Sequence, residues 1–123
     1  MTPVQKVKYL ILNLDAQWND KEPYPYPLPD IDSIYDEAPV LQDAKEEIRS
    51  GGFDTGFLSE WSRHYESKIL ADQLPDGSWV AWTYWYGGGK HGNPEEVPWM
   101  EEAFDVDCTI EMKPVNIFTK PLV

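Results

Sequence analysis

The most distinctive hydrophobic pattern is an uncharged run of eight residues, 79–86, which reads Trp-Val-Ala-Trp-Thr-Tyr-Trp-Tyr. Aromatic and β-branched residues favour strands, and the run has a typical strand length. Side chains alternate between the two faces of a strand, and neither face here is polar. The run therefore predicts a central strand that is covered on both faces. The alternative is that the face with Trp82, Tyr84 and Tyr86 lines a binding surface, as large exposed apolar patches do.

A turn signal separates this strand from a second one. Pro75-Asp76-Gly77 comes just before the run. Proline presets the first corner of a turn, and glycine accepts a positive dihedral angle at the next. The pattern predicts that residues 62–74 form a strand that pairs with 79–86 in an antiparallel hairpin.

The most regular alternation lies in residues 104–113. It predicts a half-buried strand with one wet, mostly acidic face. The apolar side would hold Phe104, Val106, Cys108, Ile110 and Met112, and the polar side Asp105, Asp107, Thr109, Glu111 and Lys113. Cys108 is thus expected to be a buried, inert thiol. Residues 115–118 would extend this strand past Pro114 or form a short edge strand.

Two segments have helical spacing. In residues 2–18, Thr2 and Gln5 stand at capping-box spacing and Pro3 suits a first helical position, which favours a helix ending near Asn19. The alternative for this segment is a buried strand over residues 8–12. Residues 38–50 predict a short helix with Leu41, Ala44 and Ile48 on one face, stopped at Gly51.

Prolines punctuate residues 22–39, where Pro23, Pro25, Pro27 and Pro29 alternate with Tyr24, Tyr26 and Leu28. Proline fixes its own backbone and pushes the preceding residue out of the helical region. The segment predicts an extended strap pinned to the domain by its tyrosines. A disordered linker carrying a recognition motif is the alternative.

The remaining stretches are loops with short helical turns. Residues 51–56 predict a loop, followed by a helical turn that carries Phe57, Leu58 and Trp61, and residues 95–102 predict a turn anchored by Val97, Trp99 and Met100. The order of elements and the short hairpin connections indicate an α+β fold, in which two or three helices pack on a small antiparallel sheet of three to four strands. At 123 residues the chain is expected to be a single domain, 1–123.

Composition narrows the classes of partner. The net charge is -12, from 22 acidic against 10 basic residues. Nucleic acids and anionic membranes are bound through Lys and Arg, so direct binding to either is not expected. The charge favours a basic protein partner, for instance a nucleic-acid-binding protein, although acidic surfaces also serve solubility alone. One cysteine, no signal-peptide pattern and no long apolar run predict a cytoplasmic protein.

Two sets of residues are candidates for function. The first is an acidic docking surface for the basic partner, with a merely solvated face as its alternative; it comprises Asp105, Asp107, Glu111, Glu95, Glu96, Glu101 and Glu102. The second is a ligand pocket with an aromatic wall, which would suit a small enzyme or a ligand-binding domain; it comprises Arg63, His64, Trp82, Tyr84, Lys90 and His91.

Other chemistry has weaker support in the sequence. Gly87 to Gly92 lacks the spacing and the following helix of a nucleotide-binding loop. His64, His91 and Glu66 could hold a metal only if the hairpin register brings them together, and Cys108 would need proof of a nearby histidine to act as a nucleophile. We therefore expect no catalytic residues, no metal and no cofactor.

Three stretches resemble small proteins carried by bacteriophages and prophages: residues 52–57, residues 62–66, and residues 82–92 with their run of aromatics followed by glycines. The resemblance covers the second half of the chain. It implies a small acidic protein of the kind that blocks host defence nucleases. The leading hypothesis is thus a non-enzymatic inhibitor that docks on a basic host protein. Alternatives are the small enzyme or ligand-binding domain and an assembly protein that dimerises through a sheet edge.

Overall fold

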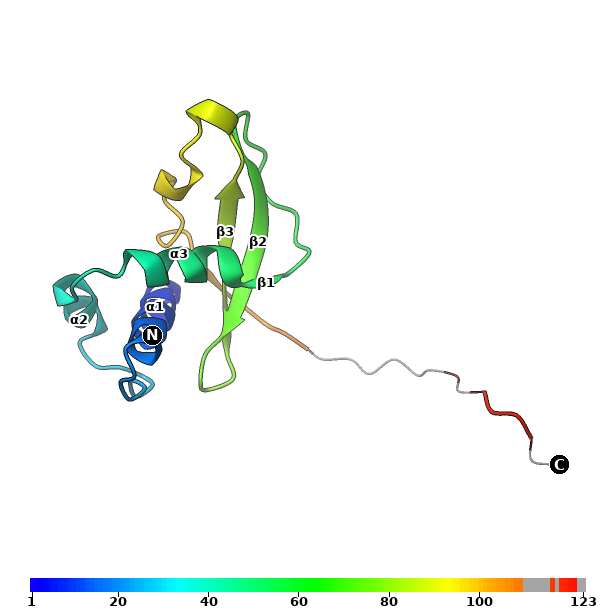
Figure 1. Ribbon diagram of the computed structural model, residues 1–123, viewed down its shortest axis with the longest axis horizontal. Coiled ribbons are helices and arrows are strands. Elements are labelled where there is room, and N and C mark those ends of the chain that lie inside the picture. The colour runs from blue at the N-terminus through cyan, green and yellow to red at the C-terminus, as the bar shows by residue number, and fades with distance from the viewer. Residues whose placement is uncertain (110–115, 117, 122–123) are drawn as a thin grey trace.

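A computed structural model describes residues 1–109, 116 and 118–121 of the chain, except for the side chain of His91. Four antiparallel strands form one sheet in the order β1-β2-β3-β4. The helices lie on one side of this sheet (Figure 1). The elements in chain order are α1 (Pro3–Trp18), α2 (Ile31–Glu37), α3 (Gln42–Gly51), β1 (Phe53–Asp54), β2 (Glu66–Gln73), β3 (Trp79–Tyr86), the 3₁₀ turns η1 (Gly89–His91) and η2 (Pro94–Glu96), and β4 (Phe104–Val106). The predicted α+β fold with a small antiparallel sheet is confirmed.

The first helix starts at a complete capping box. The Thr2 side chain accepts the backbone N–H of Gln5, and the Gln5 side chain accepts the backbone N–H of Thr2. These two bonds satisfy N–H groups that a helix start leaves without partners. The predicted helix over residues 2–18 is confirmed, with Asn19 as its C-cap, and the strand alternative is wrong.

The Pro/Tyr segment is only partly an extended strap. Tyr24 and Tyr26 pin it to α1 as predicted: the Tyr9 hydroxyl donates to the carbonyl of Tyr24 at 2.7 Å, and the Tyr9 and Tyr26 rings meet edge to face at 5.1 Å. Residues 31–37, however, fold as α2, so the prediction of a strap over all of 22–39 is wrong. The prolines act only on their own and the preceding positions, and none falls between Pro29 and Pro39.

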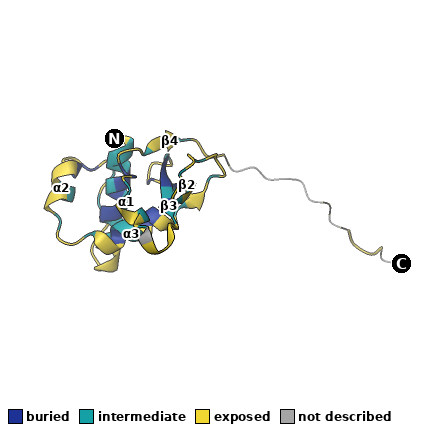
Figure 2. Cartoon of the chain, turned by 90° about the horizontal axis from the view of Figure 1, so that it is seen from above, coloured by how far each residue is buried: buried dark blue, intermediate teal, exposed yellow. Residues whose placement is uncertain are grey.

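The main core lies between the helices and the sheet. Figure 2 shows the buried residues concentrated where α1 and α3 meet β3, whereas α2 is mostly exposed. Trp82 is fully buried there; its Nε1 donates to the carbonyl of Arg49 at 3.0 Å, and its ring lies 5.8 Å from that of Trp99. Helix α3 begins at Gln42, later than predicted, and buries Ala44 and Ile48. The predicted anchors Trp99 and Met100 are both buried, in a loop that follows η2.

The predicted antiparallel hairpin of β2 and β3 is confirmed. Glu66 pairs with Tyr86 at the open end, and Gln73 pairs with Trp79 at the turn, where Gly77 has a φ of 89°. The strand starts at Glu66, so residues 62–65 lie outside it. Before it, Phe53–Asp54 forms β1 instead of part of a loop, and residues 57–61 form no helical turn.

The last strand differs most from its prediction. It covers only Phe104–Val106, and residues 107–109 have no regular structure. Residues 110–113, Glu111 included, lie outside the described residues, as do 115 and 117 of the predicted extension, whereas 116 and 118 have no regular structure. Asp105 pairs with Val80, which belongs to the helix-side core, so Asp105 faces α1 and forms an ion pair with Lys6 at 2.7 Å. The apolar residue Phe104 and the thiol of Cys108 are exposed, so the prediction of a buried Cys108 is wrong. The alternation holds within β4, but the side of Asp105 faces the main core, whereas Val106 on the other side packs against a smaller buried cluster of Ile69, Ala71 and Ala81.

Asp72, a partly buried residue on the helix side of the sheet, is expected to make the stability of the fold depend on pH. Burial raises the pKa of Asp72 above its ordinary 3.8, despite the hydrogen bond that its carboxylate accepts from the Gln73 N–H. The folded state therefore holds this proton to higher pH than the unfolded chain, and the ionisation of Asp72 lowers stability as pH rises through the folded pKa. We expect Asp72→Asn to raise the melting temperature at pH 7 but not at about pH 3, where both states are protonated.

Asp76 is a control for this prediction, because its pKa is shifted in the opposite direction. Hydrogen bonds from the Ser78 side chain and then from its backbone N–H lower the pKa of Asp76. Its ionised form therefore favours the folded state above the ordinary pKa, and Asp76→Asn should lower the melting temperature at pH 7. Shifts of the same sign in the two variants would contradict the assignment.

No helix among the described residues is both long enough and apolar enough to cross a membrane.

Candidate functional site

The sheet face that points away from the helices carries a row of large and small side chains. Phe53, Ala71, Ala81 and Phe104 are successive cross-strand partners from β1 to β4. Directly paired residues point to the same face of a sheet. The two alanines in the middle of the row are buried, and the two phenylalanines at its ends are exposed.

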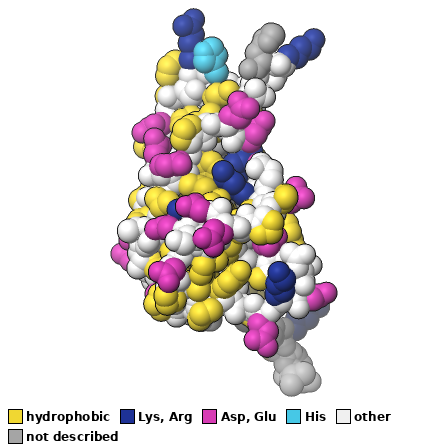
Figure 3. Space-filling model, turned by 90° about the vertical axis from the view of Figure 1, so that its left-hand side faces the viewer, with side chains coloured by type: hydrophobic (Ala, Val, Ile, Leu, Met, Phe, Trp, Pro, Cys, Tyr) yellow, Lys and Arg dark blue, Asp and Glu magenta, His cyan; other side chains and the backbone are white. Residues whose placement is uncertain are grey.

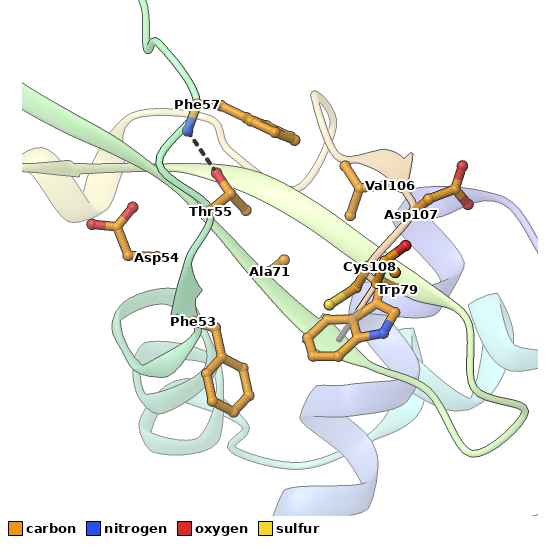
Figure 4. A pocket seen from close by; sticks show the side chains of 10 residues that line it. Phe53, Asp54, Thr55, Phe57, Ala71, Trp79, Val106, Asp107 and Cys108 are labelled. Carbon is orange, nitrogen blue, oxygen red and sulfur yellow. Dashed lines mark hydrogen bonds between the residues drawn. The ribbon is translucent and has the colours of Figure 1, made fainter. Parts of the chain in front are cut away.

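A groove of about 360 Å³, here named the sheet-face groove, lies on this face, and Phe53 and Ala71 are the members of the row that line it. Figure 4 shows Ala71 at its centre, with the side chains of Phe53, Trp79, Val106 and Phe57 around it. The rings of Phe53 and Trp79 meet edge to face at 5.8 Å. Asp54 and Asp107 also line the groove, and their carboxylates point outward at opposite ends (Figure 4). The groove is thus apolar at its floor and acidic at its rim.

Beside the groove, four large apolar side chains face solvent. We name Phe53, Phe57, Leu58 and Trp61 the apolar strip; they are 67%, 52%, 100% and 85% exposed. Single exposed apolar residues are common, but four within nine residues of one segment form a surface of the kind found at interaction sites. The fold itself gives no reason for this exposure.

Polar contacts hold the backbone of the strip along the edge of β2. The Thr55 N–H and hydroxyl both donate to the carbonyl of Ile69, and the Phe57 N–H donates to the Thr55 hydroxyl at 3.2 Å. Further along, the Ser59 hydroxyl donates to the carbonyl of Ser67 at 3.0 Å. These bonds fix the backbone and leave the apolar side chains outside, so the strip is presented on an ordered segment.

The predicted acidic docking residues lie in separate places. Glu95, Glu96 and Glu101 line a hollow with Lys45 beside η2, whereas Asp105 and Asp107 line another with Lys6 beside β4. Glu102 is exposed in the turn before β4, and Glu111 lies outside the described residues. On the face shown in Figure 3, Asp and Glu side chains are spread over the surface and interspersed with Lys and Arg. The described residues of this set therefore do not form a single acidic patch.

The predicted ligand pocket loses its aromatic wall. Trp82 is fully buried in the helix-side core, so the prediction that it lines a pocket is wrong. Tyr84 is half-buried, stacked on Tyr86 at 5.3 Å and covered by the guanidinium of Arg49 at 5.0 Å from its ring. Arg63, His64 and Lys90 are exposed, and the side chain of His91 lies outside the described residues.

The glycine-rich loop has a packing role. The Tyr65 hydroxyl accepts the backbone N–H of Asn93 at 3.2 Å, which confirms that this end of β2 reaches the loop. Gly88 has a φ of 87°, and a Cβ placed on it would lie 2.7 Å from the Tyr65 ring. The glycine is thus needed both for its backbone conformation and for close approach. Among the described residues no group of three metal-ligating side chains comes together.

We expect Gly88→Ala to lower the free energy of unfolding by about 2 kcal/mol, because it adds a left-handed non-glycine residue and a steric contact with Tyr65. Gly89→Ala is the matched control: Gly89 has a φ of 60°, and no described atom lies within 4 Å of a Cβ placed there. Urea unfolding of both variants separates the two contributions. Equal losses would show that packing against Tyr65 contributes nothing.

Sequence reasoning missed the apolar strip as a site and placed Phe57, Leu58 and Trp61 on a helical turn instead. The available signal was the concentration of Phe53, Phe57, Leu58 and Trp61 within nine residues of a glycine-containing segment. Comparison of the chain with protein-family models, with curated proteins and with solved structures finds no match.

Proposed function

We propose that this protein is a non-enzymatic acidic module that binds a basic protein partner. The apolar strip carries the proposal, because it presents large side chains to solvent on an ordered backbone segment. Protein interfaces combine a few large apolar anchors with a polar rim. The strip supplies the anchors, and Asp54 and Glu60 within the same segment supply charge at the rim.

Electrostatics favours a partner of positive charge. The chain carries -12, and the ion pairs among its described residues occupy only Asp105, Asp32 and Glu46 of the acids. Most carboxylates therefore remain available to the field around the protein. Such a field accelerates encounter with a basic surface and opposes encounter with an acidic one, nucleic acid included.

The resemblance to small bacteriophage proteins makes the proposal more specific. A basic protein that binds nucleic acid presents a positively charged groove, and an acidic protein with apolar anchors is complementary to it. We therefore propose a phage-encoded inhibitor that occupies such a groove on a host protein. Because such a groove also binds nucleic acid, the protein should compete with duplex DNA for the same partner.

Affinity capture tests the proposal. The full chain is immobilised, exposed to a bacterial lysate at low salt, and eluted along a salt gradient, with a Phe57→Ser/Leu58→Ser variant immobilised in parallel. We expect basic proteins to be retained by the native chain, displaced by rising salt or by duplex DNA, and retained less by the variant. Retention that is indifferent to salt and to the charge of the captured protein would contradict the proposal.

A further inference from the structure

A second hollow, of about 420 Å³, lies where the end of the apolar strip meets the open end of the β2–β3 hairpin. Its lining combines three aromatic side chains, two carboxylates and three serine hydroxyls, from Trp61, Tyr65, Tyr86, Glu60, Glu66, Ser59, Ser62 and Ser67. None of these side chains is basic, although Arg63 belongs to the same segment and Lys68 follows on β2. We name this feature the aromatic hollow.

The backbone and the rings around the hollow are held by contacts within the fold. Ser67 donates through its hydroxyl to the carbonyl of Glu60 at 3.0 Å, which ties the strip segment to β2. The Tyr65 hydroxyl is bonded to Asn93, and Tyr86 is stacked on Tyr84. Glu66 and Tyr86 are direct cross-strand partners. Tyr86 and Glu66 are therefore placed by the hairpin, and Tyr65 is held by the Asn93 N–H, so the arrangement of these groups needs little ordering on binding.

This combination of groups suits an organic cation. Aromatic faces attract Lys ammonium and Arg guanidinium groups, and nearby carboxylates add charge and hydrogen-bond acceptors. The Tyr86 ring is already engaged within the fold, because Lys68 Nζ lies 5.4 Å from its centroid and Tyr84 stacks on it. The indole of Trp61, which is 85% exposed, is therefore the ring that a partner cation would contact. For a metal ion the hollow offers two carboxylates and otherwise only neutral hydroxyl groups, and no group of three His, Cys, Asp or Glu side chains comes together among the described residues.

We propose that the aromatic hollow receives a single Lys or Arg side chain of the basic partner. This inference rests on the proposed function and gives its docking surface a defined geometry: the apolar strip packs on the partner, and a partner cation enters the hollow at its end. Trp61 belongs to both features, since it is 85% exposed and lines the hollow. The cation would lie between its indole and the carboxylates of Glu60 and Glu66.

The test uses the full chain, labelled with ¹⁵N, and three acetylated and amidated glycine peptides that carry one central lysine, arginine or norleucine. At low salt we expect the lysine and arginine peptides to shift the Trp61 indole N–H and the Glu66 and Tyr86 amide signals, with weak, salt-sensitive affinity. Norleucine has a similar aliphatic chain without the charge. Equal shifts with the norleucine peptide would overturn the proposal.

Variants separate this inference from the proposed function. Glu60→Gln/Glu66→Gln should weaken peptide binding by about fivefold or more, whereas Asp20→Asn/Glu22→Gln, which removes the same charge at exposed positions elsewhere, should weaken it less than about twofold. Equal effects of the two variants would mean that peptide binding depends only on the overall negative charge, and this would overturn the hollow as a site. Salt-dependent capture of basic proteins would still support the proposed function in that case. Absence of both peptide binding and basic captured proteins would overturn both.

Discussion

Phe57→Ser/Leu58→Ser is expected to weaken binding of the captured basic partner at least about tenfold, which corresponds to about 1.4 kcal/mol, while its melting temperature stays close to that of the native chain. The two side chains are 52% and 100% exposed, so the fold gains little from them and an interface would gain much. Titration calorimetry measures the affinity, and thermal unfolding measures the stability.

The matched control changes apolar residues that are exposed away from the strip. Trp18, at the end of α1, is 50% exposed and Val40, before α3, is 85% exposed. Trp18→Ser/Val40→Ser removes a comparable apolar area and should leave the affinity within about twofold of the native value. The strip would not be the docking surface if the control weakened binding as much as the strip variant did.

Trp82→Ala is expected to lower the free energy of unfolding by about 3–5 kcal/mol, a large share of the 5–15 kcal/mol typical of a domain. The indole is fully buried between β3 and the helices and packs on Trp99. Its loss leaves a cavity and removes the N–H that the carbonyl of Arg49 accepts. Urea unfolding followed by circular dichroism gives the change directly.

Two further variants show which contribution dominates. Trp82→Phe keeps an aromatic ring against Trp99 but loses the hydrogen bond to Arg49, so its loss of stability should lie between those of the native chain and Trp82→Ala. Trp61→Ala removes the same side chain from an exposed position and should change stability by less than about 0.5 kcal/mol. A loss below about 1 kcal/mol in Trp82→Ala would contradict the assignment of this residue to the core.

Local signals in the sequence were enough to predict the hairpin and the first helix. Pro75-Asp76-Gly77 specifies a turn through backbone preferences alone, and the turn then sets the register of the two flanking strands. Thr2 and Gln5 specify a helix start through reciprocal hydrogen bonds. In both cases the interactions that decide the structure join residues close together in the chain.

Predictions failed where contacts between distant segments decide the outcome. Alternation in residues 104–113 showed that two faces exist, but the pairing of β4 with β3 puts Asp105 beside Val80 on the helix side, where it meets Lys6 from the other end of the chain. Residues 31–37 fold as a helix whose Asp32 accepts hydrogen bonds from Lys8 and Gln5 of α1. Neither partner could be identified from the pattern of the segment itself.

For the candidate site, the sequence predicted the types of residue but not their arrangement. Negative charge and aromatic residues were evident from composition, yet Trp82 lies in the core whereas Trp61 is exposed. Burial of a tryptophan depends on what the rest of the chain packs against it, and a run of uncharged residues does not report that. The aromatic hollow likewise needs Tyr86 and Glu66 to be paired across the hairpin and segment 59–62 to run beside them.

The salt dependence of the affinity between the full chain and the captured partner is the most direct test of an acidic docking protein. Titrations at a series of ionic strengths give the slope of log Kd against log salt concentration. We expect Kd to increase steeply with salt, because carboxylates on this surface meet basic groups on the partner. The slope of log Kd against log salt concentration should be smaller for the Glu60→Gln/Glu66→Gln variant. A Kd that does not change with salt would contradict the proposed function.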